Sequence, residues 1–322
     1  QMDLRLSRAG NASATQGAPS RSPAAWLWHV ASLVRYRFFL YAGLLPYLLG
    51  AAWAHAILNS FAPGMFWTGL VGIGLAVVGV EAFNEYFDSR MGTDRVFDPE
   101  DTPPMSQAVL WLGVAAFGGA LAVGVVLTLQ AGWPILIYAF LGGLAAVFYV
   151  APPIRWAYRG LGETVIGLSY GPLMVLGSLY LHAPSLNPAV IGPAFLASLV
   201  PGLLITALAV TNAIPDFHQD RLVGKRNLVV RLGRDRAVWL YNGLAALALL
   251  VVLAGVLAEI FPATCLLALL AAPLVALSFV RGRATWKTPR AFVPAARAIV
   301  RAYLVAVLGF SLGLVTQPWL AV

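Results

Sequence analysis

The segment FWTGLVGIGLAVVGVEAFNEYFD, residues 66–88, decides the fold class of this chain. Residues 66–80 carry no charge, and Glu81, Glu85 and Asp88 follow them. An apolar run of about 20 residues is long enough to cross the hydrocarbon core of a bilayer, roughly 30 Å, as a helix. The segment therefore predicts a membrane-spanning helix whose final turns carry carboxylates.

The composition of the whole chain agrees with a membrane protein. Its 322 residues are 60% hydrophobic and 11% charged, whereas soluble domains are roughly 45–50% apolar and about 25% charged. This excludes a disordered chain, a collagen-like chain and an ordinary soluble enzyme, because a soluble fold of this size needs a charged surface. The single cysteine, Cys265, excludes a disulfide framework and a zinc cluster.

Apolar runs of similar length recur along the chain, which predicts an all-α polytopic membrane protein, a bundle of about nine transmembrane helices. The predicted spans lie near residues 38–58, 66–88, 107–128, 133–150, 161–181, 189–214, 237–258, 260–280 and 295–317. Residues 1–24 are polar and rich in Ser, Ala and Gly, which predicts a flexible cytoplasmic tail. They do not resemble a signal peptide, because no short apolar region with a cleavage site follows them. Residues 25–322 are predicted to form one transmembrane domain.

The Lys and Arg residues all fall on one side of the predicted bundle. With nine spans, the 21 basic residues lie before the first span, or in or just inside the connections after spans two, four, six and eight. The connections near 59–65, 129–132, 182–188 and 258–261 carry none. Basic loops mark the cytoplasmic side. This predicts a multi-pass protein of the inner (plasma) membrane with a cytoplasmic N-terminus. The net charge of +8 is explained by this topology, so no nucleic-acid partner is predicted.

Two acidic clusters lie on the basic side. Members of the first are spaced i, i+3, i+4 and i+7, which places them on one face of a helix. They are Glu81, Asn84, Glu85 and Asp88. The second cluster holds Asn212, Asp216 and Asp220, each four residues apart, on a helix that Pro215 is predicted to kink. Carboxylates at a membrane boundary are costly and therefore indicate function.

The residue types in these clusters favour one chemistry. Oxygen ligands without His or Cys suit a hard cation, and Mg²⁺ typically shares its shell with substrate phosphates. Neighbouring Arg and Lys side chains suit a diphosphate. The surrounding helices are apolar and aromatic. The pattern therefore predicts a metal-bridged diphosphate with a long apolar tail, of which a prenyl diphosphate is the obvious case.

Three segments together resemble the UbiA superfamily of intramembrane prenyltransferases. They are NEYFDSRMGTD (84–94), FYVAPPIRWAYRGLGETVIGLSYGPL (148–173) and NAIPDFHQDRLVGKRNLVVRLG (212–233). Their order, side and separation match that family, and the resemblance covers the chain from about residue 30 to its end. The six-residue step from Asp88 to Asp94 is similar to that of the 1,4-dihydroxy-2-naphthoate prenyltransferases of menaquinone synthesis.

The resemblance implies a set of site residues. The implied Mg²⁺ ligands are Asn84, Glu85, Asp88, Asp94, Asn212, Asp216 and Asp220. The implied catalytic carboxylates among them are Asp88, Asp94, Asp216 and Asp220. The candidate diphosphate ligands are Arg37, Arg95, Arg155, Lys225 and Arg226. Tyr86 and Tyr158 are further candidates for contact with the diphosphate or the acceptor. Glu81, one turn deeper, is open to a structural or a ligand role, and Glu163 is predicted to be a helix N-terminal acid.

The mechanism that the resemblance implies is electrophilic alkylation. Mg²⁺ and basic side chains stabilise the departing diphosphate of a polyprenyl diphosphate, and an aromatic carbon attacks the allylic cation. The predicted acceptor is 1,4-dihydroxy-2-naphthoate, in a protein surrounded by membrane lipid. The alternative acceptors are 4-hydroxybenzoate, homogentisate, a lipid phosphate and a sugar phosphate. A cation-coupled transporter and a non-catalytic scaffold are alternatives of other classes, and oligomeric state and prenyl chain length stay open.

Overall fold

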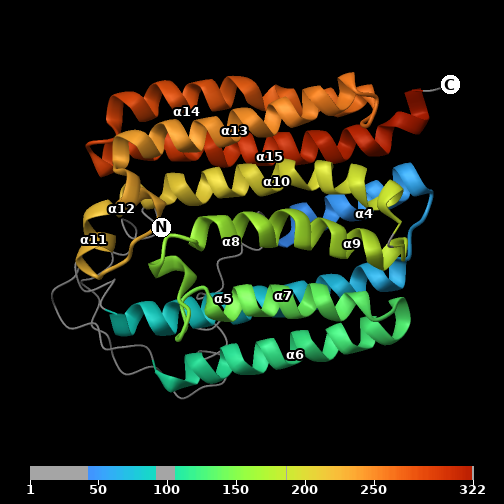
Figure 1. Cartoon of the computed structure of the whole chain (residues 1–322), viewed down its shortest axis with the longest axis horizontal. Helices are drawn as coiled ribbons and strands as arrows, with labels where there is room; N and C mark the ends of the chain where they lie inside the picture. Colours follow the sequence, from blue (N-terminus) through green and yellow to red (C-terminus); the bar gives the residue numbers. More distant parts are fainter. Residues whose placement is uncertain (1–42, 92–105, 186, 321–322) are drawn as a thin grey trace, which may run out of the picture.

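The computed structural model describes residues 43–91, 106–185 and 187–320, and within these the chain is helical without strands (Figure 1). The elements are α4 (Leu45–Leu58), α5 (Pro63–Met91), α6 (Gln107–Ala131), α7 (Pro134–Phe148), η2 (Trp156–Tyr158), α8 (Gly162–Leu168), η3 (Ser169–Leu173), α9 (Met174–His182), α10 (Pro188–Ala213), α11 (Phe217–Leu222), α12 (Leu228–Leu232), α13 (Arg234–Leu257), η4 (Ala263–Ala271), α14 (Ala272–Thr285) and α15 (Pro289–Leu320). The predicted all-α membrane fold is confirmed.

Seven helical segments within the described ranges are long and apolar enough to cross a membrane. Two of the seven are composite: α8, η3 and α9 run together from Gly162 to His182, and η4 continues into α14 from Ala263 to Thr285. Two shorter apolar helices, α4 and α7, complete the arrangement. These nine segments coincide with the nine ranges predicted from apolar run length. The predicted tail at 1–24 lies outside the described residues.

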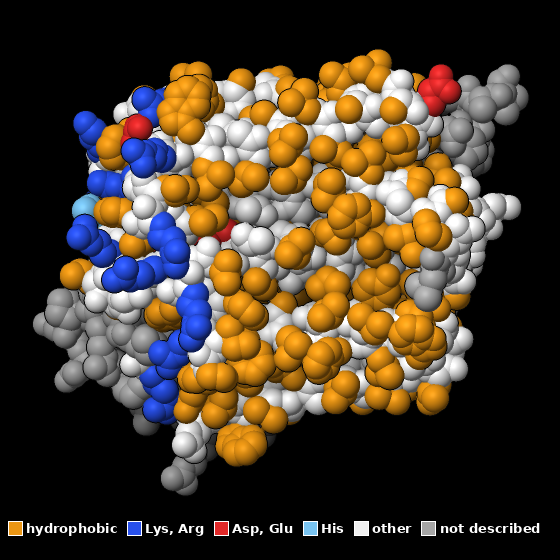
Figure 2. Space-filling model, in the orientation of Figure 1, with side chains coloured by type: hydrophobic (Ala, Val, Ile, Leu, Met, Phe, Trp, Pro, Cys, Tyr) orange, Lys and Arg blue, Asp and Glu red, His pale blue; other side chains and the backbone are white. Residues whose placement is uncertain are grey.

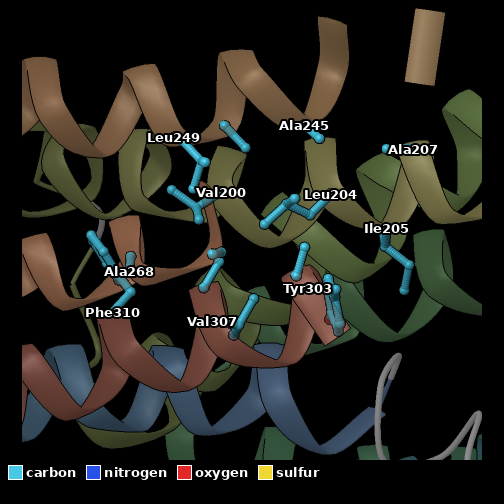
Figure 3. Packing of buried hydrophobic residues seen from close by; sticks show 14 of the residues in the cluster. Val200, Leu204, Ile205, Ala207, Ala245, Leu249, Ala268, Tyr303, Val307 and Phe310 are labelled. Carbon is cyan, nitrogen blue, oxygen red and sulfur yellow. The ribbon is translucent and has the colours of Figure 1, made fainter. Parts of the chain in front are cut away.

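The helices form two groups, which differ in the size of their cores. The large group consists of α4, α10, α11, α12, α13, η4, α14 and α15 around one extensive core (Figure 3). Small side chains let its helices approach closely. On α15, a Cβ added to Gly313 would come within 2.5 Å of the Thr264 carbonyl oxygen on η4. The core is therefore built on close backbone contact as well as on large side chains.

The small group consists of α5, α6 and α7. It has two minor cores, one around Tyr47, Leu127 and Tyr180, and the other around Ala82, Tyr86 and Val109. In the first, the Tyr47 hydroxyl on α4 donates to the Phe66 carbonyl oxygen on α5 at 2.8 Å. The π-helical turn η3 packs against α10, and α9 contacts both α4 and α5, so the composite span Gly162–His182 joins the two groups.

Short helices and loops gather at one end of the bundle, where α5 ends and where η2, α11 and α12 lie (Figure 1). We call this the rim end, and the opposite end, with residues 59–62, 183–185 and 258–262, the far end. Figure 2 shows Lys and Arg side chains gathered at the rim end. The charge segregation predicted from the sequence is therefore seen on the visible face of the folded chain.

Pro215 interrupts its helix rather than kinking it, which corrects the prediction. Helix α10 ends at Ala213, a turn follows at 214–216, and α11 begins at Phe217. The proline lacks an N–H and its ring clashes with the carbonyl of the preceding turn. Asn212 therefore does not share a continuous helix with Asp216 and Asp220, although Asp220 N still donates to Asp216 O at 2.8 Å.

Candidate active site

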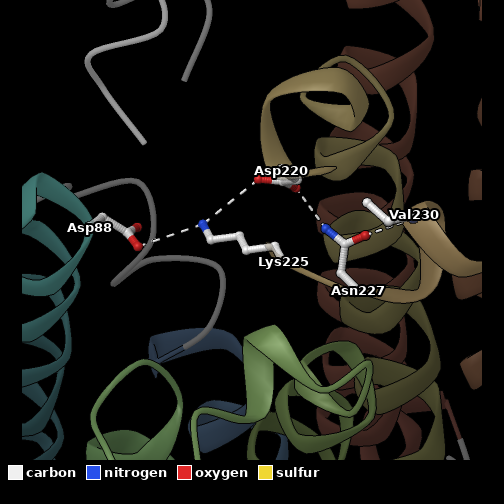
Figure 4. Close-up of polar contacts among 5 residues, drawn as sticks. All are labelled: Asp88, Asp220, Lys225, Asn227 and Val230. Carbon is white, nitrogen blue, oxygen red and sulfur yellow. Dashed lines mark hydrogen bonds and ion pairs between the residues drawn. The ribbon is translucent and has the colours of Figure 1, made fainter. Parts of the chain in front are cut away.

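Lys225 lies between carboxylates that come from the two helix groups (Figure 4). Its Nζ is 3.6 Å from Asp88 Oδ1, on the last turns of α5, and 3.8 Å from Asp220 Oδ1, on α11. All three side chains are largely shielded from solvent. The structure thus brings together the two acidic clusters that the sequence placed on one side of the membrane.

The end of α11 and the loop to α12, residues 220–227, form a tight turn that positions Asp220 and Lys225. We call this segment the hairpin. Lys225 N donates to Asp220 O at 2.8 Å, and the turn passes through Gly224 at φ +79°, a left-handed conformation that favours glycine. Asn227 Nδ2 donates to Asp220 Oδ2 at 2.6 Å, while its Oδ1 caps α12 by accepting from Val230 N at 2.8 Å. One Asp220 oxygen is therefore held by Asn227 and the other faces Lys225. Asn227 is not among the site residues predicted from the sequence, although an Asn directly before a short helical run is a capping signal.

Burial raises the pKa of the Asp220 carboxyl to about 6, and the nearby Asp216 and Asp88 carboxylates act in the same direction. Lys225 and the hydrogen bond from Asn227 lower the pKa, but they only partly offset the burial. A carboxyl with a raised pKa is stabilised in its ionised form by additional positive charge. The electrostatics of the rim end therefore favour a further cation beside Asp220.

The loop around η2 supplies an aromatic and basic wall. Lys225 Nζ lies 5.5 Å from the centroid of the Tyr158 ring, and Arg155 Cζ lies 5.9 Å from it. Burial raises the pKa of the Tyr158 phenol and the neighbouring Asp88 raises it further, so this hydroxyl keeps its proton. Arg155 has φ 53°, a strained conformation for a residue with a side chain, and its buried Nε has no hydrogen-bond partner. Such a donor suits an anionic ligand.

Two residues tie this loop to the hairpin. Glu163, in the first turn of α8, is buried and its Oε1 accepts from Leu228 N at 3.1 Å. Arg231 on α12 donates from Nε to Arg226 O at 2.8 Å and from Nη2 to the Arg159 carbonyl oxygen. A Cβ on Gly160 would lie 2.3 Å from Arg231 Nε, so this contact requires a glycine. The sequence predicts only a helix-terminal role for Glu163, and for Arg231 only a contribution to topology.

The other predicted site residues differ in burial and in the contacts that they make. Asn84 has a buried Oδ1 without a hydrogen-bond partner, one turn of α5 before Asp88. Asn212 and Arg226 are exposed, and Glu85 is half-buried. Tyr86 instead packs in the minor core between α5 and α6, with the Arg90 guanidinium over its ring at 4.4 Å. Arg37, Asp94 and Arg95 lie outside the described residues.

The donors at the rim end fit Mg²⁺ in type. The orphaned Asn84 Oδ1 and the carboxylates of Asp88, Asp216 and Asp220 are all oxygen donors. Within the described ranges, no three His, Cys, Asp or Glu side chains gather closely enough to hold a metal ion. Lys225 lies between Asp88 and Asp220, so one positive charge already bridges these two carboxylates.

Comparison with known proteins places these features in a family. The model of the UbiA prenyltransferase family matches residues 43–296. The chain is 31% identical over 235 residues to the 1,4-dihydroxy-2-naphthoate octaprenyltransferase of Mycobacterium tuberculosis, covering 70% of this chain and 75% of that protein. It is 34% identical over 202 residues to the protein of the same name from Escherichia coli, covering 56% of this chain and 63% of that protein.

Solved structures share the fold at low sequence identity. A UbiA homolog from Aeropyrum pernix K1 superposes with a TM-score of 0.60 at 18% identity, covering 82% of this chain and 98% of that one. A UbiA homolog from Archaeoglobus fulgidus bound to GPP and Mg²⁺ gives a TM-score of 0.57 at 18% identity, covering 88% and 99%. These likenesses show that the two helix groups have the arrangement of that fold.

Proposed function

The chain belongs to the UbiA prenyltransferase family, and from that premise we propose that it transfers a prenyl group from a polyprenyl diphosphate to 1,4-dihydroxy-2-naphthoate. The observation that carries the proposal is the position of Lys225 between Asp88 and Asp220. A site with carboxylates from two helix groups and a lysine between them suits a metal-bound diphosphate. The apolar helices around it suit a prenyl tail.

In this proposal the chain's own residues bind and orient the diphosphate. Lys225 and Arg155 bind its oxygens, the Tyr158 hydroxyl donates to it, and Arg226 approaches from the exposed edge. Arg37 and Arg95 are proposed as further ligands from segments outside the described residues. The apolar helices exclude water while the bond between carbon and diphosphate oxygen breaks, so the prenyl cation reacts with the acceptor ring.

Mg²⁺ is the proposed cofactor. It would be held by Asp88, Asp216 and Asp220 with Asn84, and Glu85, Asp94 and Asn212 are proposed as further ligands. Bound there, Mg²⁺ supplies positive charge that neutralises the diphosphate as it departs. The similarity to structures solved with GPP and Mg²⁺ supports this choice.

We also propose that the rim end faces the cytoplasm of a cell whose inner membrane holds the protein. Basic residues concentrate at this end, and connections on the cytoplasmic side are enriched in Lys and Arg. The substrate diphosphate would then enter from the water side while its tail lies among the helices. Residues 25–322 would form the single membrane domain.

The proposal is tested with purified protein, Mg²⁺, labelled polyprenyl diphosphate and a panel of acceptors. We expect prenylated naphthoate from the wild type, and none with Asp88→Asn or after treatment with EDTA. Asp235→Asn is the matched control, because Asp235 also pairs with a basic residue, Arg283, at the rim end. Product from 4-hydroxybenzoate or homogentisate instead would overturn the acceptor. No diphosphate release with any acceptor would overturn the enzyme class and favour a transporter.

A further inference from the structure

Basic side chains concentrate at the rim end of the large group, where α13 begins and α14 ends (Figure 1). Residues 234–239 and 279–290 hold six basic side chains and a single acidic one, Asp235. We call these two segments the basic patch. Its basic residues are Arg234, Arg236, Arg281, Arg283, Lys287 and Arg290. The proposed diphosphate and metal site uses none of them, so prenyl transfer does not account for the patch.

An ion pair and an aromatic pair connect α13 to α14 within the basic patch. Arg283 on α14 pairs with Asp235 on α13. Four residues away on each helix, the rings of Trp239 and Phe279 lie with their centroids 4.8 Å apart. Residues four apart share a helix face, and Arg283 Cζ lies 5.4 Å from the Trp239 ring centroid. Because α13 enters the bundle here and α14 leaves it, the aromatic pair lies one turn deeper than the ion pair.

The end of α14 is held against α13 by Arg234. Its Nη1 donates to the Lys287 carbonyl oxygen at 3.1 Å, and its Cζ lies 5.6 Å from the Trp286 ring centroid. Lys287 Nζ lies 5.3 Å from the same ring. Lys287 follows Arg283 by four residues, and both side chains are exposed. The basic patch therefore presents two exposed basic side chains, each beside an aromatic ring.

The surface below these charges is apolar. On α14, Val280 is 66% exposed and Leu277 is 38% exposed, and Trp239 on α13 is 57% exposed. The Tyr241 hydroxyl donates to the Ser278 carbonyl oxygen at 3.0 Å, which joins α13 to α14 behind this surface. Tryptophan rings are enriched at the headgroup level of a bilayer. The arrangement therefore suits an amphiphile with an acidic head and apolar tails.

We propose that the basic patch binds an anionic phospholipid of the surrounding bilayer. Arg283 and Lys287 bind the phosphate of the headgroup, and the acyl chains lie against Trp239 and the apolar face of α14. Arg283 can serve Asp235 and the phosphate together, because a guanidinium has five N–H donors. Clusters of basic residues at the end of a membrane helix attract anionic lipids. A zwitterionic lipid is attracted less, since its own ammonium neutralises the phosphate. The inference does not depend on which acceptor the chain prenylates.

The test measures lipid binding by native mass spectrometry of the full chain in detergent. The protein is titrated with phosphatidylglycerol or with phosphatidylethanolamine carrying identical acyl chains. We expect the first phosphatidylglycerol to bind at least tenfold more tightly than phosphatidylethanolamine. The double variant Arg283→Gln with Lys287→Gln should reduce this preference below threefold. Should that variant fail to fold, Lys287→Gln alone should weaken phosphatidylglycerol binding about fivefold, the contribution typical of one basic side chain at a lipid surface.

Arg90→Gln is the matched control. Arg90 is an exposed basic residue at the rim end of α5 that also lies over an aromatic ring, but that ring belongs to the buried Tyr86. It should keep the wild-type preference. Equal affinity of the wild type for both lipids would overturn the inference, as would a full preference in the double variant or an equal loss in Arg90→Gln. Displacement of the lipid by millimolar inorganic phosphate would assign the basic patch to a soluble anion and overturn it too.

Discussion

The two helix groups differ in packing, and the proposed site lies where they meet. In the most apolar stretch of α10, in the large group, 61% is buried, against 22% for α6 in the small group. The large group holds Asp220 and Lys225 in a hairpin with several hydrogen bonds, whereas the small group contributes Asp88 from a helix end. Of the ion pairs between described residues, only that of Lys225 with Asp88 joins the groups at the rim end.

The two groups therefore contribute to the site in different ways. The large group presents Asp220 within a hydrogen-bonded hairpin, and the small group presents Asp88 near the end of α5. Contacts at the far end, such as that of Tyr47 with Phe66, hold the groups together there. At the rim end, Lys225 lies between Asp88 of the small group and Asp220 of the large group. The effect of the charge between these two carboxylates can therefore be tested directly.

The largest effect on activity is expected from removing the carboxylate of Asp220 in the large group. Asp220→Asn should lower the rate of prenyl transfer by about 100-fold or more, since loss of one transition-state charge contact costs roughly 3 kcal/mol. The initial rate at saturating Mg²⁺ is the measurement. The melting temperature in detergent should change little, because the amide can still accept from Asn227. A rate within threefold of the wild type would remove Asp220 from the site.

A pair of glycine substitutions tests the close contact between α15 and η4 in the large group. Gly313→Ala, in the large group, places a Cβ 2.5 Å from the Thr264 carbonyl oxygen, and such overpacking typically costs about 1–3 kcal/mol. Gly118→Ala, on α6, meets no atom within 4 Å and should be neutral or stabilising, since Ala is the better helix former. Thermal denaturation in detergent checks both. Equal shifts in melting temperature would contradict the close contact of Gly313 with η4.

Charge removal between the groups should have opposite effects on two ligands. Lys225→Gln removes a positive charge 3.6 Å and 3.8 Å from two carboxylates. The affinity for free Mn²⁺, followed by electron paramagnetic resonance, should rise about fivefold, which corresponds to about 1 kcal/mol for partly screened charges. The affinity for prenyl diphosphate should fall. Lys287→Gln, an exposed lysine beside Trp286 at the same end, is the control. Unchanged Mn²⁺ binding would show that Lys225 does not compete with metal.

The sequence predicts those features of the arrangement that depend on local patterns. It does not predict contacts between residues that are far apart in the chain. Run length predicts the nine helical segments because bilayer thickness sets it, and the alternation of basic loops predicts that the two clusters lie on one side. Lys225 was predicted as a diphosphate ligand, but not its position between Asp88 and Asp220. That position depends on how two separately packed groups approach each other, which no local pattern encodes.

The residues around the hairpin show the same difference between local patterns and distant contacts. The break at Pro215 could have been predicted from the proline alone, and Asn227 from its place before a helix. The contact of Glu163 with Leu228 joins residues 65 positions apart, and that of Arg231 with Arg159 joins residues 72 apart. Tertiary contacts over such separations leave no spacing rule, so they emerge only in the folded chain.

The smallest predicted effect concerns those contacts. Arg231→Lys keeps the charge but cannot reproduce both hydrogen bonds that the guanidinium makes to Arg226 O and Arg159 O, since a lysine presents one compact ammonium. The η2 loop should then hold Arg155 and Tyr158 less firmly. We expect KM for prenyl diphosphate to rise about threefold, roughly 0.7 kcal/mol, with kcat within a factor of two. Arg236→Lys, an exposed arginine two residues into α13, is the control. A fall in kcat with unchanged KM would instead place Arg231 in contact with the reacting groups, and the loop would then be part of the chemistry rather than its support.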